Sequence, residues 1–273
     1  MKRRWKIWST KCFTPAEETI FETLSLHSLR SGKATVTQTA KAVITDVTTI
    51  AFDADDTLWH NETIFRLTEE KFAALLRDDM DSDPLMERLL AIERKNLRFY
   101  GYGIKGFTLS MIETALEVTE HKLSPKVIAE ILAAGREMQA HPVEILPGVR
   151  ETLEALSRRF RLVLITKGDL FDQERKVAES GLADLFNAVE IVSEKTPHTY
   201  RYLLTRHGTG PDEAVMIGNS LRSDIRPALE AGAWGVYIPY HITWGMEIAD
   251  EPVDHRRYRK LSSVDQVLKL VEG

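Results

Sequence analysis

The sequence predicts an α/β protein whose core is a doubly wound parallel sheet with an inserted α-helical cap domain. Short apolar runs rich in β-branched residues alternate with amphipathic segments over residues 148–239, and this rhythm is typical of a parallel sheet with helices on both faces. A similar apolar run stands alone at 47–52, and four amphipathic segments follow it in succession. We therefore expect the isolated run to join the sheet and the four segments to form a second domain above it.

The first expected strand, 47–52, ends at an acidic turn. The cap helices are expected at 67–80, 84–99, 107–121 and 124–139, because apolar residues recur there at three- and four-residue spacing. Ser124 and Pro125 form a favourable N-cap and first-turn pair for the last of them. The glycine-rich tract 101–106 separates the second helix from the third.

The later elements alternate between helix and strand. Helices are expected at 148–158, 170–180, 197–207 and 222–231, and strands at 161–166, 188–192, 214–218 and 235–239. The basic run at 256–260 is expected to be a solvated surface. The expected domains are an N-terminal extension of residues 1–45, poorly ordered, an α/β core of residues 46–66 and 140–273, and a helical cap of residues 67–139.

Composition excludes several classes of protein. The chain has 273 residues, of which 43% are hydrophobic and 28% charged, and its formal net charge is −5, which argues against nucleic-acid binding. The one cysteine, Cys12, excludes an internal disulfide and a cysteine-based zinc site. No apolar run reaches the roughly 20 residues of a membrane span. We expect a cytoplasmic protein, while the basic, hydroxyl-rich residues 1–45 leave organelle targeting open.

Polar residues gather directly after four successive expected strands. They are Asp53, Asp55, Asp56 and Thr57 after the first strand, Thr166, Lys167 and Gly168 after the second, Lys195 after the third, and Asn219, Ser220 and Asp224 after the fourth. Each loop alone is typical of a solvated turn or a helix cap. Open parallel sheets bind ligands at the carboxyl ends of their strands, so the four loops together predict one shared site.

This ordered set resembles the haloacid dehalogenase superfamily of hydrolases, in the branch with a Rossmann-like core and a helical cap after the first strand. The first family motif, Asp-x-Asp-x-Thr, is matched by residues 53–57, and the second and third motifs by Thr166 and Lys195. The fourth motif is matched by residues 218–224, GNSLRSD, where Asn219 replaces a common aspartate. The resemblance covers about residues 46–240.

The resemblance implies a phosphoric monoester hydrolase that works through an aspartyl-phosphate. Asp53 would attack the phosphorus, and Asp55 would protonate the leaving oxygen and later activate water. The presence of Asp55 favours phosphate over halide as the substrate group. The resemblance further implies a Mg²⁺ cofactor held by Asp53, the backbone carbonyl of Asp55 and the fourth motif, with Asn219 and Asp224 as its candidate ligands.

The remaining motifs would bind the substrate. Thr166 and the backbone N–H groups of Lys167 and Gly168 would hold phosphate oxygens, and Lys195 would neutralise the charge on the nucleophile and the phosphoryl group. Because cap loops of similar enzymes contact the leaving group, Tyr102 and Lys105 are expected to do so. The expected partner is a small soluble phosphomonoester, with no nucleic acid and no membrane, and the oligomeric state is left open.

Three alternatives stay open at this point. Asn219 either binds Mg²⁺ through its neutral oxygen, which its ligand chemistry favours, or marks a non-catalytic relative that only binds a phosphate ligand. A phosphotransferase or phosphomutase would use the same intermediate with an acceptor other than water. Residues 59–62 either pack at the hinge to the cap or contact the substrate.

Overall fold

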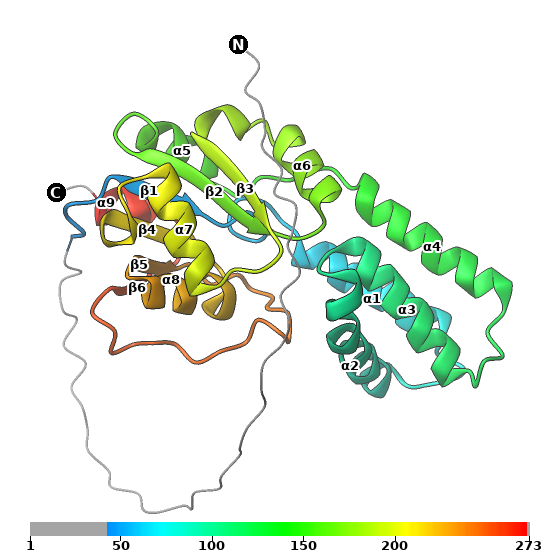
Figure 1. The fold of residues 1–273 in the computed structure, drawn as a ribbon. Helices are drawn as coiled ribbons and strands as arrows, with labels where there is room; N and C mark the ends of the chain where they lie inside the picture. The colour runs from blue at the N-terminus through cyan, green and yellow to red at the C-terminus, as the bar shows by residue number, and fades with distance from the viewer. Residues whose placement is uncertain (1–42, 272–273) are drawn as a thin grey trace, which may run out of the picture. The chain divides into compact units, whose positions relative to one another are not determined.

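A computed structural model describes residues 43–271 of the chain (Figure 1). Within these residues, six parallel strands form one sheet in the order β3-β2-β1-β4-β5-β6. The strands are β1 (Thr49–Phe52), β2 (Arg161–Lys167), β3 (Ala188–Val192), β4 (Ala214–Gly218), β5 (Trp234–Tyr237) and β6 (Tyr258–Lys260). In this strand order, ligands bind beyond the carboxyl ends of the strands, where the order reverses. The expected fold class is confirmed, and β1 lies at the reversal, between β2 and β4.

Side chains of β1 alternate between two apolar layers, one on each face of the sheet. Ile50 and Phe52 pack with α5 (Val149–Leu156), α6 (Leu170–Glu179) and α9 (Val267–Leu270). Ala51 faces the opposite layer, which contains α7 (Pro197–His207) and α8 (Arg226–Ala231). Figure 1 shows α7 and α8 in front of the sheet. All of β1 is buried, as expected for the central strand of a parallel sheet.

The core begins slightly before β1. Ile44 is buried in the same layer as Ile50, and its N–H donates to the carbonyl of Leu270 at 2.8 Å. Of the last residues of the expected extension, Ile44 therefore belongs to the packed core, whereas residues 1–42 lie outside the described residues.

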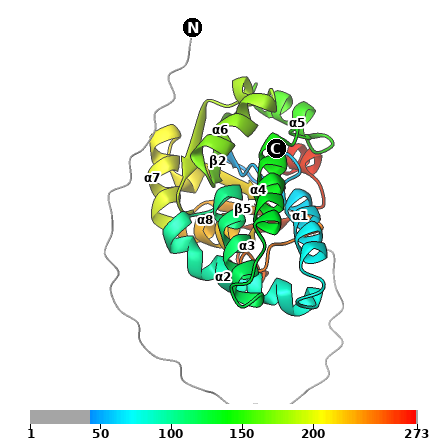
Figure 2. The ribbon, with the colours of Figure 1, turned by 90° about the vertical axis from the view of Figure 1, so that its right-hand side faces the viewer.

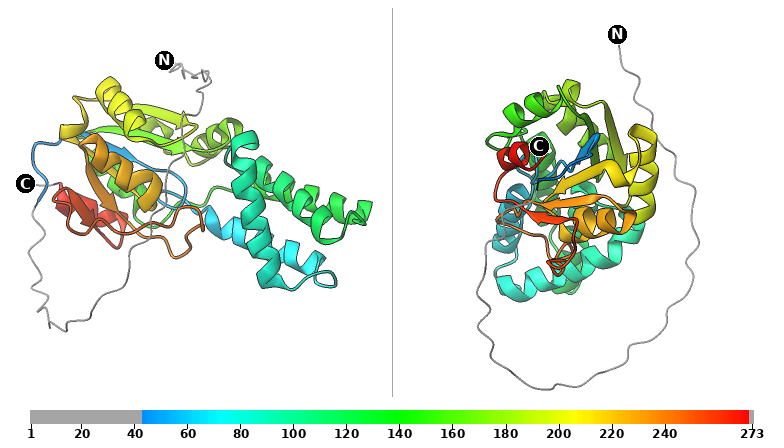
Figure 3. Two further views of the ribbon diagram at one scale, coloured as in Figure 1. Left: turned by 60° about the horizontal axis from the view of Figure 1, so that its bottom comes forward. Right: turned by 90° about the vertical axis from the view of Figure 1, so that its left-hand side faces the viewer.

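The helices between β1 and α5 pack around an apolar cluster of their own (Figures 2 and 3). They are α1 (Glu62–Leu75), α2 (Ser82–Tyr100), α3 (Ile104–Val118) and α4 (Pro125–Ala140). Ser124 caps α4 as expected, accepting the N–H of Val127 at 3.3 Å. We call these helices the cap.

Helix α1 begins five residues before its expected start at 67. The carboxylate of Asp56, in the loop after β1, accepts the N–H groups of Asn61 at 2.8 Å and Glu62 at 3.0 Å. These are backbone donors that the first turn of a helix leaves without an internal partner. The Asp56 carboxylate that satisfies these donors lies several residues before the helix. Apolar spacing within the helix therefore did not locate the N-terminus of α1.

The segment expected as one helix at 222–231 divides in two. A π-helical turn covers Leu221–Ile225, with the N–H of Ile225 donating to the carbonyl of Ser220 at 3.1 Å, and α8 follows it. Pro227 lies in the first turn of α8, where its missing N–H is not needed. Short 3₁₀ turns lie at Ala183–Leu185, Pro211–Glu213 and Val264–Gln266.

The basic run near residue 258 is solvated as expected at Arg256 and Lys260, which are exposed, but it also forms a strand that the sequence did not predict. It contributes β6, the edge strand beside β5. The guanidinium of Arg259 lies 4.8 Å from the ring centre of Trp234, and the ammonium of Lys260 lies 5.5 Å from that of Tyr237. Charged side chains on an edge strand discourage pairing with another chain. No helix in the described range is long and apolar enough to cross a membrane.

The cap buries one carboxyl group, that of Glu93 on α2. Burial raises the pKa of Glu93 from 4.5 to about 7, and the nearby carboxylate of Glu69 contributes to the increase. A hydrogen bond from the Trp244 side chain opposes it.

Replacing Glu93 with glutamine should therefore remove a stability penalty that grows with pH. Because the folded-state pKa is raised, the stability contributed by Glu93 is fully present below about pH 4.5 and is lost as pH rises through about 7. A pKa change from 4.5 to about 7 corresponds to at most about 3 kcal/mol. In urea unfolding between pH 5 and pH 8, we expect the free energy of unfolding of Glu93→Gln to exceed that of the wild type by about 1–3 kcal/mol. Glu87→Gln, on the exposed side of the same helix, is the matched control; parallel pH profiles for wild type and Glu93→Gln would contradict this assignment.

Candidate active site

The loop after β1 brings two aspartates to the wall of one cavity. The N–H of Asp53 donates to the carbonyl of Ile217 at 2.9 Å, so the pairing with β4 continues one residue past the strand. The chain then turns through Asp56, whose φ of 61° lies in the left-handed region. Asp53 and Asp55 both line a cavity of about 160 Å³ between this loop and the cap.

A buried lysine joins two carboxylates at the base of this cavity. The ammonium of Lys195, from the loop between β3 and α7, contacts Asp53 Oδ1 and lies 2.7 Å from Asp224 Oδ1. Burial, followed by the Asp224 carboxylate, raises the pKa of Asp53 to about 7, and Lys195 opposes that increase. Burial alone would lower the pKa of Lys195, but Asp224 and Asp53 outweigh it and raise that pKa above its usual value. The lysine therefore stays charged beside the expected nucleophile.

Asp224 is oriented toward Lys195 and the backbone. Its second oxygen, Oδ2, accepts the N–H of Ser220 at 2.9 Å, and the residue is fully buried. Each carboxylate oxygen of Asp224 therefore has a partner: Lys195 for Oδ1 and the N–H of Ser220 for Oδ2. This placement makes Asp224 a support for Lys195.

Asn219 lies beside the oxygens that a metal ion would need. One atom of its terminal amide is 3.1 Å from Asp53 Oδ2 and 3.0 Å from the backbone carbonyl of Asp55, and its NH₂ group satisfies both acceptors when it faces them. Rotating the amide by a half-turn places its oxygen at that position instead. Neighbouring oxygens around Mg²⁺ at about 2.1 Å lie about 3 Å apart, so this spacing fits a hard cation.

The residues that could hold a metal ion at this site include few negatively charged side chains. The described residues contain no group of three or more His, Cys, Asp or Glu side chains placed to hold a metal ion. A cation beside Asp53 would therefore also depend on the backbone carbonyl of Asp55 and the amide oxygen of Asn219.

The expected phosphate-binding residues reach the same cavity. Thr166, Lys167 and Gly168 all line it, at the carboxyl end of β2. The ammonium of Lys167 is already paired with Glu247 and lies 2.7 Å from Ser223 Oγ. Gly168 has a φ of 149°, and an added Cβ would lie 2.7 Å from Gln173 Nε2, so the position requires glycine.

Asp55 is held by three donors that sequence reasoning did not identify as part of the site. Trp59 Nε1 donates to Oδ1 at 2.7 Å, Gln173 Nε2 donates to Oδ2 at 2.8 Å, and Lys176 Nζ lies 3.0 Å from Oδ1. Burial disfavours the charged form of Lys176, but Asp55 and Asp172 raise its pKa above the usual value.

One sequence signal could have found Gln173 and Lys176. They lie three residues apart on α6, the helix that starts directly after Gly168. Residues at that spacing share a helix face, and the first turns of a helix after a parallel strand lie near the carboxyl edge of the sheet. Glu247 has no such signal, because it comes from the long irregular segment between β5 and β6.

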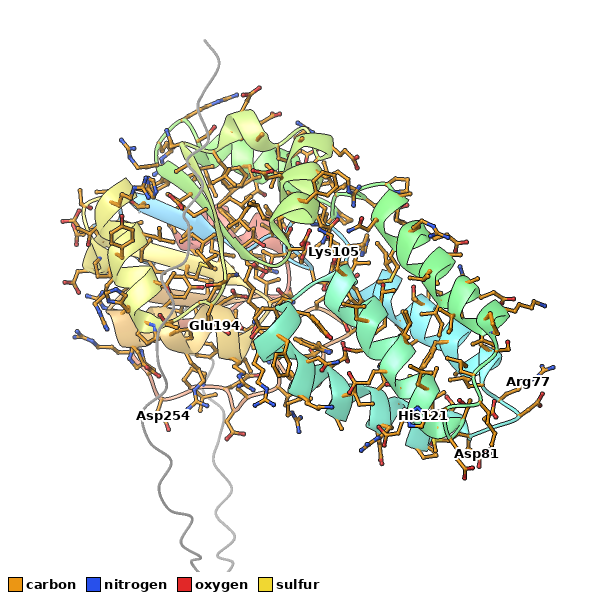
Figure 4. The ribbon with its side chains drawn as sticks, turned by 45° about the vertical axis from the view of Figure 1, so that its right-hand side comes forward. Arg77, Asp81, Lys105, His121, Glu194 and Asp254 are labelled. Atoms are coloured by element: carbon orange, nitrogen blue, oxygen red, sulfur yellow. The ribbon has the colours of Figure 1, made fainter. Side chains whose placement is uncertain are left out.

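The two cap residues expected to contact the substrate lie in different surroundings. Tyr102 lines the cavity, and its hydroxyl donates to Glu194 at 2.7 Å. Lys105 instead lies 3.0 Å from Asp169, with its side chain 57% exposed, and it is not among the residues that line the cavity. Figure 4 labels Lys105 and Glu194 where the cap meets the core.

The residues that lead into the cap act as a hinge support. Trp59 is buried, and its ring N–H is used by Asp55. Tyr240, from the segment after β5, hydrogen-bonds His60 and lies 2.8 Å from Thr63 Oγ1. Burial raises the pKa of Asp56, which caps α1, to about 7. The structure thus gives Trp59 and His60 packing contacts at the hinge.

Comparisons with known proteins agree with this geometry. The family model for haloacid dehalogenase-like hydrolases matches residues 47–232. Glyceraldehyde 3-phosphate phosphatase of Pyrococcus furiosus is 24% identical over 82% of this chain and 92% of its own length, and human N-acylneuraminate-9-phosphatase is 23% identical over 68% and 79%. A haloacid dehalogenase-like family hydrolase from Xanthomonas campestris has a solved structure with 42% identity and a TM-score of 0.73, covering 84% of this chain and 96% of that one.

The family recognised from the four loops is therefore confirmed. The matched range contains the loops that carry Asp53, Thr166, Lys195 and Asn219, and the structure brings all four residues to one cavity. The chain belongs to the haloacid dehalogenase-like hydrolase family.

Proposed function

We propose that the protein is a Mg²⁺-dependent phosphatase that hydrolyses a small phosphomonoester through an aspartyl-phosphate on Asp53. The contact of the Lys195 ammonium with Asp53 and Asp224 carries this proposal. Lys195 favours the ionised form of Asp53 and places a positive charge beside the expected nucleophile, at the carboxyl end of the central strand. The names of the relatives, which are phosphatases, support the same conclusion.

In the first step, a carboxylate oxygen of Asp53 attacks the phosphorus, and the bond from phosphorus to the leaving oxygen breaks. Asp55 gives that oxygen a proton, so the product is an alcohol. In the second step, Asp55 takes a proton from water, the water oxygen bonds to phosphorus, and the bond to Asp53 breaks to release inorganic phosphate. The contacts of Asp55 with Lys176 and Gln173 suit its role as the base in this second step.

The remaining residues of the cavity hold the phosphoryl group. Thr166 and the backbone after β2 would bind its oxygens, and Lys195 would offset its charge. Asp53, the carbonyl of Asp55 and Asn219 would hold Mg²⁺, which offsets the repulsion between the carboxylates and the phosphate. The cap helices line one side of the cavity, which favours a small substrate. A cytoplasmic location is also part of the proposal.

Hydrolysis of p-nitrophenyl phosphate tests the proposed function. We expect release of p-nitrophenol with Mg²⁺, no release with EDTA, and a loss of at least about a thousandfold in kcat for Asp53→Asn, since an amide is a poor nucleophile. Asp184→Asn, on the exposed surface of the core, is the matched control and should keep the wild-type rate. EDTA-resistant release, or an active Asp53→Asn protein, would contradict the mechanism.

Substitution of Asn219 by aspartate tests the metal site without an activity assay. A carboxylate 3.1 Å from Asp53 Oδ2 adds repulsion in the absence of metal and attraction when a cation is bound. We therefore expect a lower Tm than wild type in EDTA, together with about a tenfold tighter Mg²⁺ affinity in calorimetry. Unchanged Mg²⁺ affinity and unchanged Tm would place the metal away from Asn219.

A further inference from the structure

The cap side of the cavity has a different chemistry from the phosphate side. It is lined by Glu62 from α1, Glu93 and Asn96 from α2, and Ser110 from α3, together with the apolar side chains of Phe65, Leu97 and Phe107. Trp244, from the segment between β5 and β6, closes the wall beside Glu93. In a phosphatase, this is the side that receives the leaving group.

No lysine that lines the cavity is left to pair with a second anion. Lys195 is shared by two carboxylates, Lys176 is paired with Asp55 and Asp172, and Lys167 is paired with Glu247. Among the lining residues, these three lysines are the cations, and arginine does not occur. A leaving group that carried a carboxylate or another phosphate would face Glu62 and Glu93 without compensation.

The uncharged polar groups of the cavity offer acceptors. Asn96, 4% exposed, already uses its NH₂ group, which donates to Ser110 Oγ at 3.2 Å and to Glu113 Oε2 at 2.8 Å. The Ser110 hydroxyl donates to the carbonyl of Gly106 at 2.9 Å. What remains on this wall is the amide oxygen of Asn96 and one lone pair of Ser110 Oγ.

Gln173, on α6 of the core, adds a further amide beside Asp55. It lines the same cavity and is 2% exposed, and its NH₂ group donates to Asp55 and to the carbonyl of Lys167. Its Oε1 is buried and accepts no hydrogen bond from any described residue. This oxygen has almost no accessible surface, so the acceptors offered to a leaving group are those of the cap wall.

We propose that this subsite binds a leaving group that is an alcohol bearing hydroxyl or ammonium donors and no anionic group. The inference rests on the proposed phosphatase function and deepens it by naming the substrate class. Glu62, Glu93 and the amide oxygen of Asn96 accept hydrogen bonds from such donors. When they are ionised, the two glutamates also repel carboxylates and phosphates. The family alone does not select this class, because its members are named for different substrates.

The two glutamates repel an anionic leaving group only in their ionised forms. Burial and the neighbouring carboxylates raise the pKa of Glu62 to about 8 and that of Glu93 to about 7. Donors from a ligand would stabilise their ionised forms, and a bound ammonium would do so most strongly.

Three phosphates of nearly equal size separate the possibilities: 2-hydroxyethyl phosphate, phosphoethanolamine and 2-phosphoglycolate. They differ in whether the second carbon carries a hydroxyl, an ammonium or a carboxylate. With the Mg²⁺-loaded full chain at about pH 9, where both glutamates are ionised, we expect kcat/KM for each of the first two to exceed that for 2-phosphoglycolate by at least about tenfold, the effect of about 1.4 kcal/mol. Equal rates, or a preference for 2-phosphoglycolate, would overturn the inference.

In Glu93→Gln, the ratio of kcat/KM for 2-hydroxyethyl phosphate to that for 2-phosphoglycolate should fall by at least about threefold, because one repelling charge is removed. Glu87→Gln, on the same helix but outside the cavity, should leave the ratio unchanged. A ratio between substrates does not move when a variant only loses folded protein, and Glu62→Gln provides a second variant with the same expected direction. An unchanged ratio in both cavity variants would overturn the inference.

The two proposals fail in different ways. If p-nitrophenyl phosphate and all three test phosphates are left intact, the phosphatase function is wrong and the substrate class falls with it. If p-nitrophenyl phosphate is hydrolysed and 2-phosphoglycolate is cleaved as well as the others, only the substrate class is wrong.

Discussion

Two carboxylates that are buried at the carboxyl end of β1 share one lysine, and the site is built around this contact. Asp53, Asp224 and Lys195 come from three different segments of the chain, which follow β1, β4 and β3. Removing one partner from a buried ionic group typically costs about 3–5 kcal/mol, because the other charge is left uncompensated. The contact therefore holds three strand ends together while it keeps the nucleophile beside a positive charge.

The excess of carboxylates around this contact explains other features of the cavity. Asp55 would repel Asp53, but it has its own cation in Lys176 and two further donors. Glu247 likewise pairs with Lys167 and accepts from Ser223 Oγ at 2.6 Å, and its pKa stays below the usual value, because these partners outweigh its burial. Each lysine of the site is thus used locally, so a phosphate substrate needs a further source of positive charge, which is the physical argument for a metal ion.

The connection between sheet and cap uses the same loop as the chemistry. Asp56 is adjacent to Asp55, and its carboxylate accepts the first backbone N–H groups of α1. Trp59 packs in the core layer beneath the loop and donates to Asp55. A movement of the cap would therefore act directly on the surroundings of the acid/base residue, since both depend on the same seven-residue stretch from Asp53 to Trp59.

Local sequence determined the strands β1 to β5, most helices and the motif residues of this protein, but not the edge strand β6. β3, β4 and α7 begin and end where periodicity placed them, because apolar spacing and caps act over a few residues. Asp53, Thr166, Lys195 and Asn219 were identified because each follows a strand, and parallel strands bring their carboxyl ends to one edge. Only the tertiary structure decided how the charges are paired: that Lys176 holds Asp55, that Glu247 holds Lys167, and that Lys105 turns to Asp169. These pairs join residues that are 64 to 121 positions apart, and no local pattern encodes which partner a charged side chain meets across such a distance.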